Sequence, residues 1–529
     1  MNRPGVFLEF IKVFNLNVYV FIALALVLGS WSCSSRPIKD KNTFVIATYD
    51  DVKDWDPATA FSLEVLPMSN MYEPLLWFDA STTPGKVLPG LATSYTKSND
   101  GLIWKFNLRE NVFFHDGKEF NAETVKFVVE RNKKLNGGAS YIWDPVEKII
   151  INSSHEVTFF LSSPVPFDKI VSSQYGSWMY SPNIINIPSD SLLNGYGSGT
   201  GPYQLKKWVR NKHLLLEKFD NYWRGWTTLN HYSSILIQVV SESSTRLQMI
   251  QSGLADYAIL IPAQLLNILD ENPDIIVTYL DSWTNEFYML NTKKPPTDNL
   301  WFRRALASSF DRETVDKYIY KNTGVRAKGL IPQSMPLFQE PDSLLNFDLD
   351  RARIYLEKSK INTNNTTIDF SFVSTYEEYR LTAFMLLDNL RSLGLSLELK
   401  PGIWSTNWDK AKNIETSPNI ISMAWWPTLS SPSDWFYGLY KTEKEPLFNL
   451  AYYSDSAVDS LIDLAWVNES IDPEMAADIY KQIQNILIDD CVVIPAVDIK
   501  IPSVLKNNIK GLKSNPAYST IFIYELSKN

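Results

Sequence analysis

Two blocks of alternating strand-like and helix-like segments constrain the fold of this chain most strongly. In the first block, FVIATY at 44–49 and IWKFNL at 103–108 have the β-branched and aromatic bias, or the strict alternation, of strands. In the second block, FYMLN at 287–291 and TIDFSFV at 367–373 each precede a helical pattern. Such alternation predicts an α/β protein with two sheet-centred lobes. Within the first block, the stretch 62–78 is predicted to be a helix with Met68, Met71, Tyr72 and Leu75 on one face, and Asn121 is predicted to be the N-cap of a later helix.

Length and charge narrow the class of protein further. The 529 residues exceed what one hydrophobic core holds, since single cores stop growing near ~250–300 residues. Ligands of two-lobed α/β proteins bind in the crevice at the strand ends. A net charge of −9 argues against a nucleic-acid partner, because such a partner requires a basic surface.

The N-terminus is typical of a targeting signal. Arg3 and Lys12 precede an uninterrupted apolar run at 18–28, which suits a signal peptide and is short for a membrane span. Cys33 follows and resembles the lipidated cysteine of a bacterial lipoprotein, although Ser30 stands where that signal usually has Leu. We expect a signal peptide at 1–33, lipidation of Cys33 and a tether at 34–42; ordinary cleavage or an uncleaved anchor are the alternatives.

Two cysteines limit the chain to one disulfide, and lipidation of Cys33 would leave none. Cys491 lies in the apolar run CVVIP, where a small buried hydrophobe is expected.

Signatures of catalysis and metal binding are absent from the sequence. No two of His115, His155, His213 and His231 have the spacing of HExxH. The loop Gly195–Gly201 fits neither a Walker loop, nor GxGxxG, nor GxSxG, and is interpreted as flexible or tightly turned backbone. We expect no catalytic residue, metal site or cofactor, although a glycosidase with two distant carboxylates stays open as a weak alternative.

Several motifs, in this order and spacing, carry a family resemblance. The chain resembles the family 5 bacterial extracellular solute-binding proteins, the peptide and nickel receptors of ABC importers, from about Phe44 to its end. The motifs are WDPATA…MYEPLLWF (55–78), the stretch Leu88–Arg131, GTGPYQLKKW with NYWRG (199–225), Asn291–Val315, SDSAVDSLIDLAW (454–466) and IYKQIQNILIDDCVVIPAV (479–497).

The resemblance implies a two-lobed periplasmic-binding-protein fold of type II, the Venus-flytrap clamp, with an extra subdomain in the first lobe. We expect lobe 1 at 43–284, including the subdomain at about 76–190, lobe 2 at 285–496, and a return to lobe 1 at 497–529. The lobes would close on ligand by hinge motion. Arg109, Asp116 and Arg303 are expected to hold the fold rather than touch ligand.

The same resemblance implies a ligand site near Glu64 and in the loop Met423–Tyr440. Trp425 or Trp426 matches a Trp that lines the pocket of peptide receptors. Those receptors place an Asp for the peptide ammonium three residues later, where this chain has Thr428 or Leu429.

A buried ammonium needs a charged partner. Either Asp434 or Glu64 substitutes for the missing Asp, or the ligand lacks a free amine and is an oligosaccharide, a metal chelate or another small organic solute. Trp425, Trp426 and Trp435 would also suit sugar stacking, and packing between the lobes is the alternative for these rings.

The sequence therefore predicts a non-enzymatic, monomeric substrate-binding lipoprotein of the periplasm or cell envelope. Its expected partners are a small solute, most simply an oligopeptide or dipeptide, the permease subunits of an ABC importer, and the membrane through the N-terminal anchor. The alternatives are a secreted hydrolase of peptides or oligosaccharides, an oligosaccharide or metal-chelate receptor on the same fold, and an adhesion or sensing lipoprotein without a permease.

Overall fold

The structure is a computed structural model in which residues 40–82, 85–188, 195–227, 230–269, 271–321, 323–363 and 366–528 are described. The expected signal peptide, Cys33 and tether residues 34–39 lie outside these ranges. Residues Phe44–Asn529 form one compact unit. Across the described ranges, none of the helices combines the length and the apolar character needed to span a membrane.

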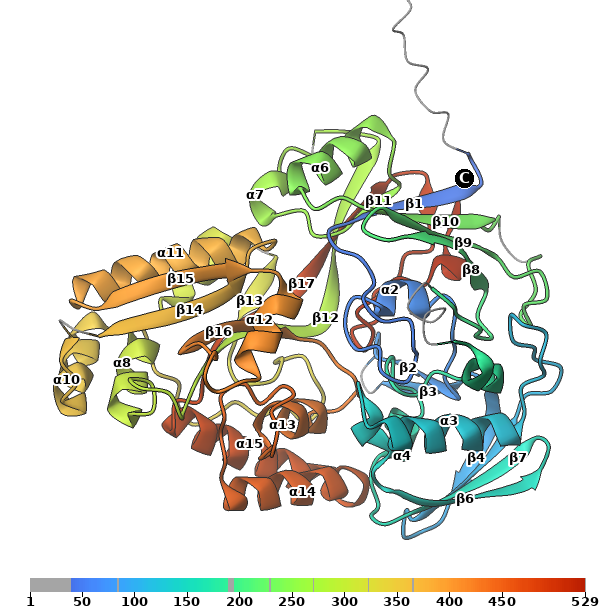
Figure 1. Ribbon diagram of the computed structural model, residues 1–529, viewed down its shortest axis with the longest axis horizontal. Coiled ribbons are helices and arrows are strands. Elements are labelled where there is room, and N and C mark those ends of the chain that lie inside the picture. Colours follow the sequence, from blue (N-terminus) through green and yellow to red (C-terminus); the bar gives the residue numbers. More distant parts are fainter. Residues whose placement is uncertain are drawn as a thin grey trace, which may run out of the picture. The chain divides into compact units, whose positions relative to one another are not determined.

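One large mixed sheet runs through this unit (Figure 1). In the described part of the chain it has 11 strands in the order β15-β14-β16-β12-β17-β11-β1-β10-β9-β8, with β13 (Gly324–Arg326) paired to β17. We call the strands on one side of β12 and β17 the β1 half: β1 (Thr43–Thr48), β8 (Tyr203–Val209), β9 (His213–Lys218), β10 (Ser234–Val239) and β11 (Tyr257–Ala258). The strands on the other side are the β14 half: β14 (Thr367–Val373), β15 (Ser396–Gly402) and β16 (Ile420–Trp425).

Two long strands, β12 (Ile275–Leu290) and β17 (Val493–Lys506), join the two halves. They pair antiparallel with each other, while one end of β17 pairs with β11 and one end of β12 pairs with β16. Their register shifts between Leu280 and Thr284. The backbone ladder thus continues from one half to the other through a local irregularity.

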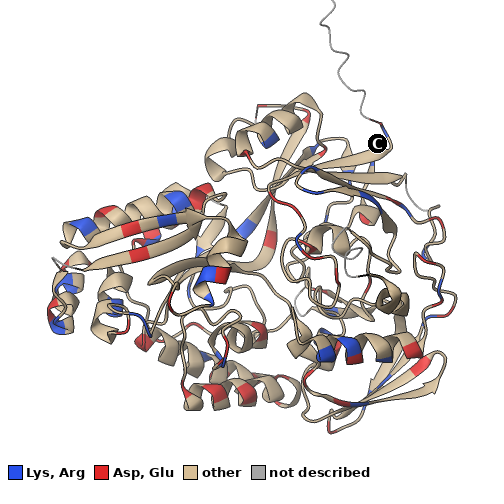
Figure 2. Cartoon of the chain, in the orientation of Figure 1, with Lys and Arg blue, Asp and Glu red and all other residues tan. Residues whose placement is uncertain are grey.

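Helices cover both faces of the β14 half, because its apolar strands are buried on both sides. On one face Tyr288 and Phe370 pack against α8 (Leu300–Ser308), η3 (Val315–Tyr320), α10 (Leu349–Ser359) and α11 (Glu377–Ser392), with the turn α9 (Arg312–Thr314) between α8 and η3. On the other face Phe287 and Met423 pack against α12 (Trp404–Ala411), α13 (Ser433–Tyr440), α14 (Ser456–Ile471) and α15 (Pro473–Asp489). The outer side of α11 carries both signs of charge in local ion pairs (Figure 2).

A separate antiparallel sheet follows the order β4-β5-β7-β6, with α3 packed on it. Its elements are β4 (Ala92–Lys97), β5 (Ile103–Leu108), β6 (Val146–Ser153), β7 (Glu156–Leu161) and α3 (Ala122–Leu135). The alternation predicted for 103–108 is confirmed, since Trp104, Phe106 and Leu108 are buried. The predicted N-cap is confirmed too: Asn121 Oδ1 accepts from the backbone N–H of Thr124 at 3.1 Å.

The remaining elements are short. They are α2 (Val65–Met68), β2 (Leu76–Asp79), β3 (Lys86–Pro89), η1 (Ser140–Trp143), α4 (Phe167–Ile170), η2 (Pro182–Asn186), α6 (Ser243–Ser252), α7 (Ala263–Leu266), β18 (Ile509–Lys510), η5 (Ile523–Glu525) and β19 (Ser527–Lys528).

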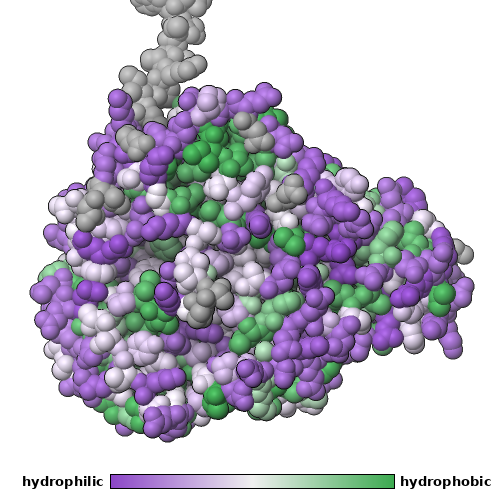
Figure 3. Space-filling view, turned by 180° about the vertical axis from the view of Figure 1, so that it is seen from behind, coloured by the Kyte–Doolittle hydropathy of each residue, from purple (hydrophilic) through white to green (hydrophobic). Residues whose placement is uncertain are grey.

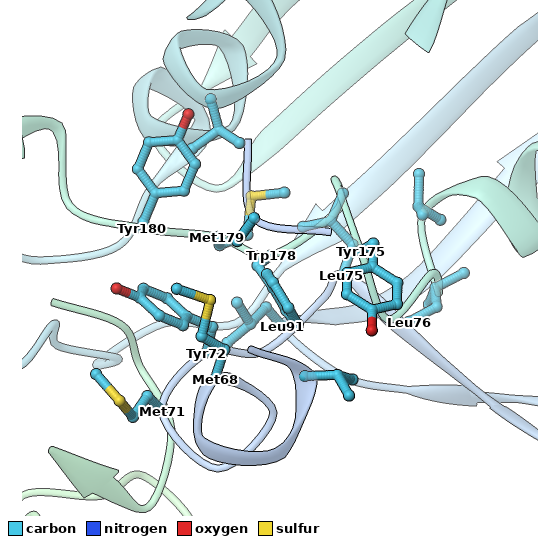
Figure 4. Close-up of a cluster of buried hydrophobic side chains, with 14 of the residues drawn as sticks. Met68, Met71, Tyr72, Leu75, Leu76, Leu91, Tyr175, Trp178, Met179 and Tyr180 are labelled. Atoms are coloured by element: carbon cyan, nitrogen blue, oxygen red, sulfur yellow. The ribbon is translucent and has the colours of Figure 1, made fainter. Parts of the chain in front are cut away.

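The stretch 62–78 departs from the sequence expectation. A single amphipathic helix was expected there, but only Val65–Met68 is helical and the chain then turns into β2. Pro74 prevents one continuous helix over the whole stretch, because a proline disfavours helical geometry in the residue before it. The four apolar residues expected on one helix face are nevertheless all buried, and they pack around Trp178 as Figure 4 shows: Met68, Met71, Tyr72 and Leu75.

The glycine-rich loop packs directly on this cluster. A Cβ built on Gly199 would lie 2.0 Å from the carbonyl oxygen of Met71, and the N–H of Gly201 donates to that same oxygen at 2.9 Å. Glycine is therefore required for close backbone approach, in line with the interpretation of the loop as tightly turned backbone.

We expect Gly199→Ala to destabilise the protein by about 3 kcal/mol, because the new methyl group must displace backbone atoms. Gly394→Ala is the matched control, since its Cβ meets nothing within 4 Å and only its φ of +76° opposes the change. This control substitution should lower the free energy of unfolding by about 1 kcal/mol. Thermal and urea unfolding measure both; equal losses would contradict the close approach.

Candidate functional site

A cavity of about 250 Å³ lies where the two halves of the large sheet meet. Tyr49 and Val239 line it from the β1 half, Ile501 from β17, and Tyr376 and Trp426 from the segments that flank the β14 half. The register irregularity of β12 borders it as well, through Leu280 and Thr284. We call this cavity the cleft.

Most of the residues around the cleft are apolar. They include Val52, Leu63, Val65, Leu66, Leu214, Ile237, Val239, Ile259, Leu260, Leu280, Ile499, Ile501, Pro502 and Ile521. The charged side chains on its described wall are Asp50, Asp51, Asp281 and Lys513. Asp51 is already bound, because its carboxylate accepts from Trp208 Nε1 at 3.0 Å and from the N–H of Asn211 at 2.6 Å.

Hydrogen bonds between distant segments enclose the cleft. The hydroxyls of Tyr49 and Tyr376 lie 2.9 Å apart. Trp426 Nε1 donates to the hydroxyl of Tyr175 at 3.1 Å, and Ser173 Oγ donates to the carbonyl of Thr428 at 2.6 Å. These contacts connect the β1 half and the segment after α4 to the β14 half.

Two of the residues expected from the sequence lie at or beside the cleft. Trp426 is half-buried and lines it. Glu64 is 2% exposed, and its neighbours Leu63 and Val65 are in the wall. One oxygen of Glu64 accepts from the N–H of Lys53 at 2.8 Å, whereas Oε2 is buried without a protein partner. Burial raises the pKa of the Glu64 carboxyl, against the lowering effect of the backbone N–H groups.

The other three expected residues are packed inside the β14 side of the protein. Trp425, Asp434 and Trp435 are buried, and the described wall of the cleft includes none of them. Trp435 Nε1 donates to Asn285 Oδ1 at 2.9 Å. A direct contact of these residues with ligand stays a prediction.

Asp434 is the centre of a buried network. Its carboxylate accepts from the hydroxyl of Tyr141 at 2.8 Å, from Trp425 Nε1 at 3.0 Å and from the N–H of Thr428 at 2.8 Å. Burial raises the pKa of Asp434 from 3.8 to about 7, even though these three donors favour the charged form. The carboxylate thus ties the 423–440 loop to Tyr141 beside the small sheet.

The C-terminal segment contributes residues that sequence reasoning missed. Lys513, Ser519 and Thr520 line the cleft. The segment has no strand or helix periodicity, so no sequence signal pointed to it.

The residues expected to be structural do form structural contacts. Arg303 donates to the carbonyl of Asp490, and Arg109 lies over the ring of Trp223 at 4.0 Å. His115 Nε2 lies 3.0 Å from the carbonyl of Gly201, and burial lowers the pKa of His115 to about 4. Cys491 is 2% exposed, and burial raises the pKa of its thiol to about 12.

Two larger cavities are present, and the one lined by Trp77 adjoins the cleft, with which it shares Lys513, Asn515, Tyr518, Thr520 and Ile521. One of about 750 Å³ is lined by Trp77, Trp223 and Phe522, and one of about 610 Å³ by Pro295 and Thr366. The cleft is the better candidate because both halves of the large sheet and the strands that join them build its wall. Over the described ranges, no group of three or more His, Cys, Asp or Glu side chains is placed to hold a metal.

The sequence is similar to a known protein family and to known proteins over most of its length. Residues 86–446 match the family described as bacterial extracellular solute-binding proteins, family 5 Middle. The chain is 25% identical over 508 residues to the probable D,D-dipeptide-binding periplasmic protein DdpA of Escherichia coli, covering 94% of this chain and 96% of DdpA. It is 25% identical over 495 residues to the glutathione-binding protein GsiB of Salmonella typhi, covering 92% and 94%.

Solved structures share the fold. The periplasmic binding protein DppA from Helicobacter pylori, in complex with the peptide STSA, superposes with a TM-score of 0.83 at 20% identity, over 92% of this chain and 98% of DppA. NikZ from Campylobacter jejuni, in complex with Ni(L-His), gives 0.81 at 20% identity, over 92% and 100%. The two-lobed type II periplasmic-binding-protein fold expected from the sequence is confirmed.

We expect Asp434→Asn to remove a pH dependence of stability. The native pKa is raised, so folded Asp434 retains a proton that the unfolded chain releases, and the wild type loses stability as pH rises from about 4 to about 7. Asn keeps an acceptor for Trp425 and Thr428 and can donate to the oxygen of Tyr141. The gain of the variant over the wild type should grow by roughly 2–4 kcal/mol across this window.

Urea unfolding over the same pH range measures this difference. Asp388→Asn, whose side chain is 75% exposed on α11, controls for the change of charge. Parallel curves for wild type and Asp434→Asn would contradict the buried, protonated carboxyl.

Proposed function

The chain belongs to the bacterial extracellular solute-binding proteins of family 5, and from this premise we propose that it is the substrate-binding component of an ABC importer that captures a short peptide in the cleft. The observation that carries the proposal is the wall of the cleft, which is built by both halves of the large sheet together. A ligand that contacts both halves favours the conformation in which they meet.

The long strands provide the hinge for this function. β12 and β17 belong to both halves, and their register shift lies beside Leu280 and Thr284 in the wall of the cleft. Bulged pairing bends more readily than a regular ladder. Rotation about this point would open the cleft and leave the packing of each half intact.

The size and chemistry of the cleft favour a dipeptide with apolar side chains. About 250 Å³ is slightly below the roughly 300–1,000 Å³ of sites for drug-sized ligands. Its aliphatic wall offers few partners for sugar hydroxyls, and among its described residues it has no His or Cys to bind a metal chelate. A peptide matches such a wall because its side chains are buried while its termini require only a few charged groups.

Two acids are candidates for the ammonium group of the peptide. Asp50 lines the cleft directly, and the peptide ammonium would compete there with Lys53 Nζ, which lies 3.0 Å from Asp50 Oδ1. Glu64 has a buried oxygen without a protein partner beside the cleft. Either would replace the Asp that the peptide receptors of this family carry three residues after their pocket Trp.

The remaining proposals concern the setting of the protein. We infer an exported, periplasmic or envelope lipoprotein without enzymatic activity that works as a monomer and delivers solute to permease subunits. On the face shown in Figure 3, hydrophobic residues form separate groups among hydrophilic ones, which is ordinary for a monomeric surface.

The binding proposal predicts a loss of affinity in Trp426→Ala. Removing a ring from the wall should weaken binding of an aliphatic dipeptide such as Leu-Leu by about 10-fold or more. The thermal midpoint should fall by less than in Trp425→Ala, because Trp426 is only half-buried. Trp301→Ala, whose ring packs with Tyr355 on the far side of α8, is the control. Trp425→Ala, by contrast, removes a buried ring and should lower the midpoint of unfolding.

Isothermal titration and mass spectrometry of solutes that co-purify with the protein provide the readout. A receptor returns its dipeptide intact. Cleavage of the peptide, or a retained solute without any peptide bond, would overturn the proposed function.

The lipoprotein proposal has its own test. Expressed with its own N-terminus in a Gram-negative host, the wild type should incorporate radiolabelled palmitate and fractionate with membranes, whereas Cys33→Ser should do neither. Equal labelling of the two chains would exclude Cys33 as the anchor.

A further inference from the structure

The C-terminal segment 511–522 forms a fixed part of the wall of the cleft. Asn515 Nδ2 donates to the carbonyl of Phe78 at 2.9 Å, and Asn515 Oδ1 accepts from the N–H of Ala80 at 3.1 Å. The hydroxyl of Tyr518 donates to the carbonyl of Ser172 at 2.8 Å and accepts from the N–H of Phe78 at 2.9 Å. Asn515 and Tyr518 thus use their side chains to hold the segment in place.

Between and beside these anchors, three residues line the cleft: Lys513, Ser519 and Thr520. Lys513 and Thr520 also border the adjoining cavity of about 750 Å³. Ser519 Oγ and Thr520 Oγ1 are buried and have no hydrogen-bond partner in the protein. A buried hydroxyl without a partner costs about 1–3 kcal/mol, so a ligand that accepts hydrogen bonds from both is favoured at this position. The anchors fix the backbone, and little of it must reorder when ligand binds.

Charge selects which ligand group is favoured there. Among the described residues that line the cleft, Lys513 is the only Lys or Arg, against three Asp. The ammonium of Lys513 and the hydroxyls of Ser519 and Thr520 can together donate hydrogen bonds to an oxyanion. A charge-assisted hydrogen bond from the ammonium to a carboxylate is stronger than a hydrogen bond between neutral groups.

We propose that Lys513, Ser519 and Thr520 form a subsite for a carboxylate of the ligand, so that the protein selects peptides with a free carboxyl group over capped ones. The proposal rests on the proposed function in that the ligand is a short peptide. It goes further because it names the group of the peptide, a carboxylate, that this segment binds.

Three dipeptide probes separate the sources of the carboxylate: Leu-Leu, Leu-Leu amide, and Leu-Glu amide, whose only carboxylate is on a side chain. The wild type should bind Leu-Leu at least about 10-fold more tightly than its amide. Lys513→Met should lose this discrimination by binding Leu-Leu about 10-fold more weakly and the amide as the wild type does. The double variant Ser519→Ala/Thr520→Ala should also weaken the binding of Leu-Leu and leave the binding of the amide unchanged.

Lys510→Met is the matched control, because Lys510 is exposed on β18 in the same part of the chain and does not line the cleft. Thermal midpoints confirm that each variant is folded, which the exposed position of Lys513 favours. Isothermal titration then gives the affinities.

The outcomes distinguish this inference from the proposed function. Equal affinity of the wild type for Leu-Leu and its amide, or unchanged discrimination in Lys513→Met, overturns the carboxylate subsite while the receptor function stands. Leu-Glu amide bound as tightly as Leu-Leu, with the same loss in Lys513→Met, supports the subsite and assigns it to an acidic side chain. Binding of none of the three by the wild type overturns the receptor function for dipeptides and the subsite with it.

Discussion

The antiparallel pairing of β12 with β17 is the constraint on which the rest of the structure depends. Each strand belongs to both halves of the large sheet, so one backbone ladder fixes the distance and direction between them. The register of this ladder shifts near Leu280 and Thr284 and again between Glu286 and Phe287, and the cleft lies at the first of these shifts. A ligand bound there would contact both halves and the proposed hinge between them, which would couple binding to closure without unfolding either core.

Buried polar atoms without protein partners indicate where a ligand would form hydrogen bonds in the cleft. Glu64 Oε2, Ser519 Oγ and Thr520 Oγ1 are buried and lack protein partners. By contrast, Asp51 in the wall of the cleft is bound by Trp208, and Asp434 away from the cleft is bound by Tyr141 and Trp425. A peptide with charged termini would supply partners for these three atoms, Glu64 Oε2, Ser519 Oγ and Thr520 Oγ1.

Much of the fold could be predicted from local sequence patterns. The rest depends on contacts between segments that are distant in the sequence. The alternation of Trp104 and Phe106 and the cap at Asn121 were predictable, because strand faces and helix starts depend on near neighbours. The single helix over 62–78 was predicted wrongly, because Pro74 is incompatible with a helix continued to Phe78 even though the apolar residues have helical spacing. Of the expected ligand-binding residues, Trp426 lines the cleft and Glu64 lies beside it, and contact of either with ligand stays a prediction. The sequence could not distinguish Trp426 from the buried Trp425 and Trp435, since all three are apolar rings in one loop. Lys513, Ser519 and Thr520 reach the cleft only because β17 returns the chain to the β1 half, which no local pattern reveals.

The most direct test of this account is a crystal structure of the protein purified together with its own solute. The account predicts density for a compact, peptide-like molecule in the cleft, enclosed by Trp426 on one side and by the segment from Lys513 to Ile521 on the other. Density beside Trp77 and Trp223 instead, or a cleft filled by the side chains of the protein itself, would contradict it.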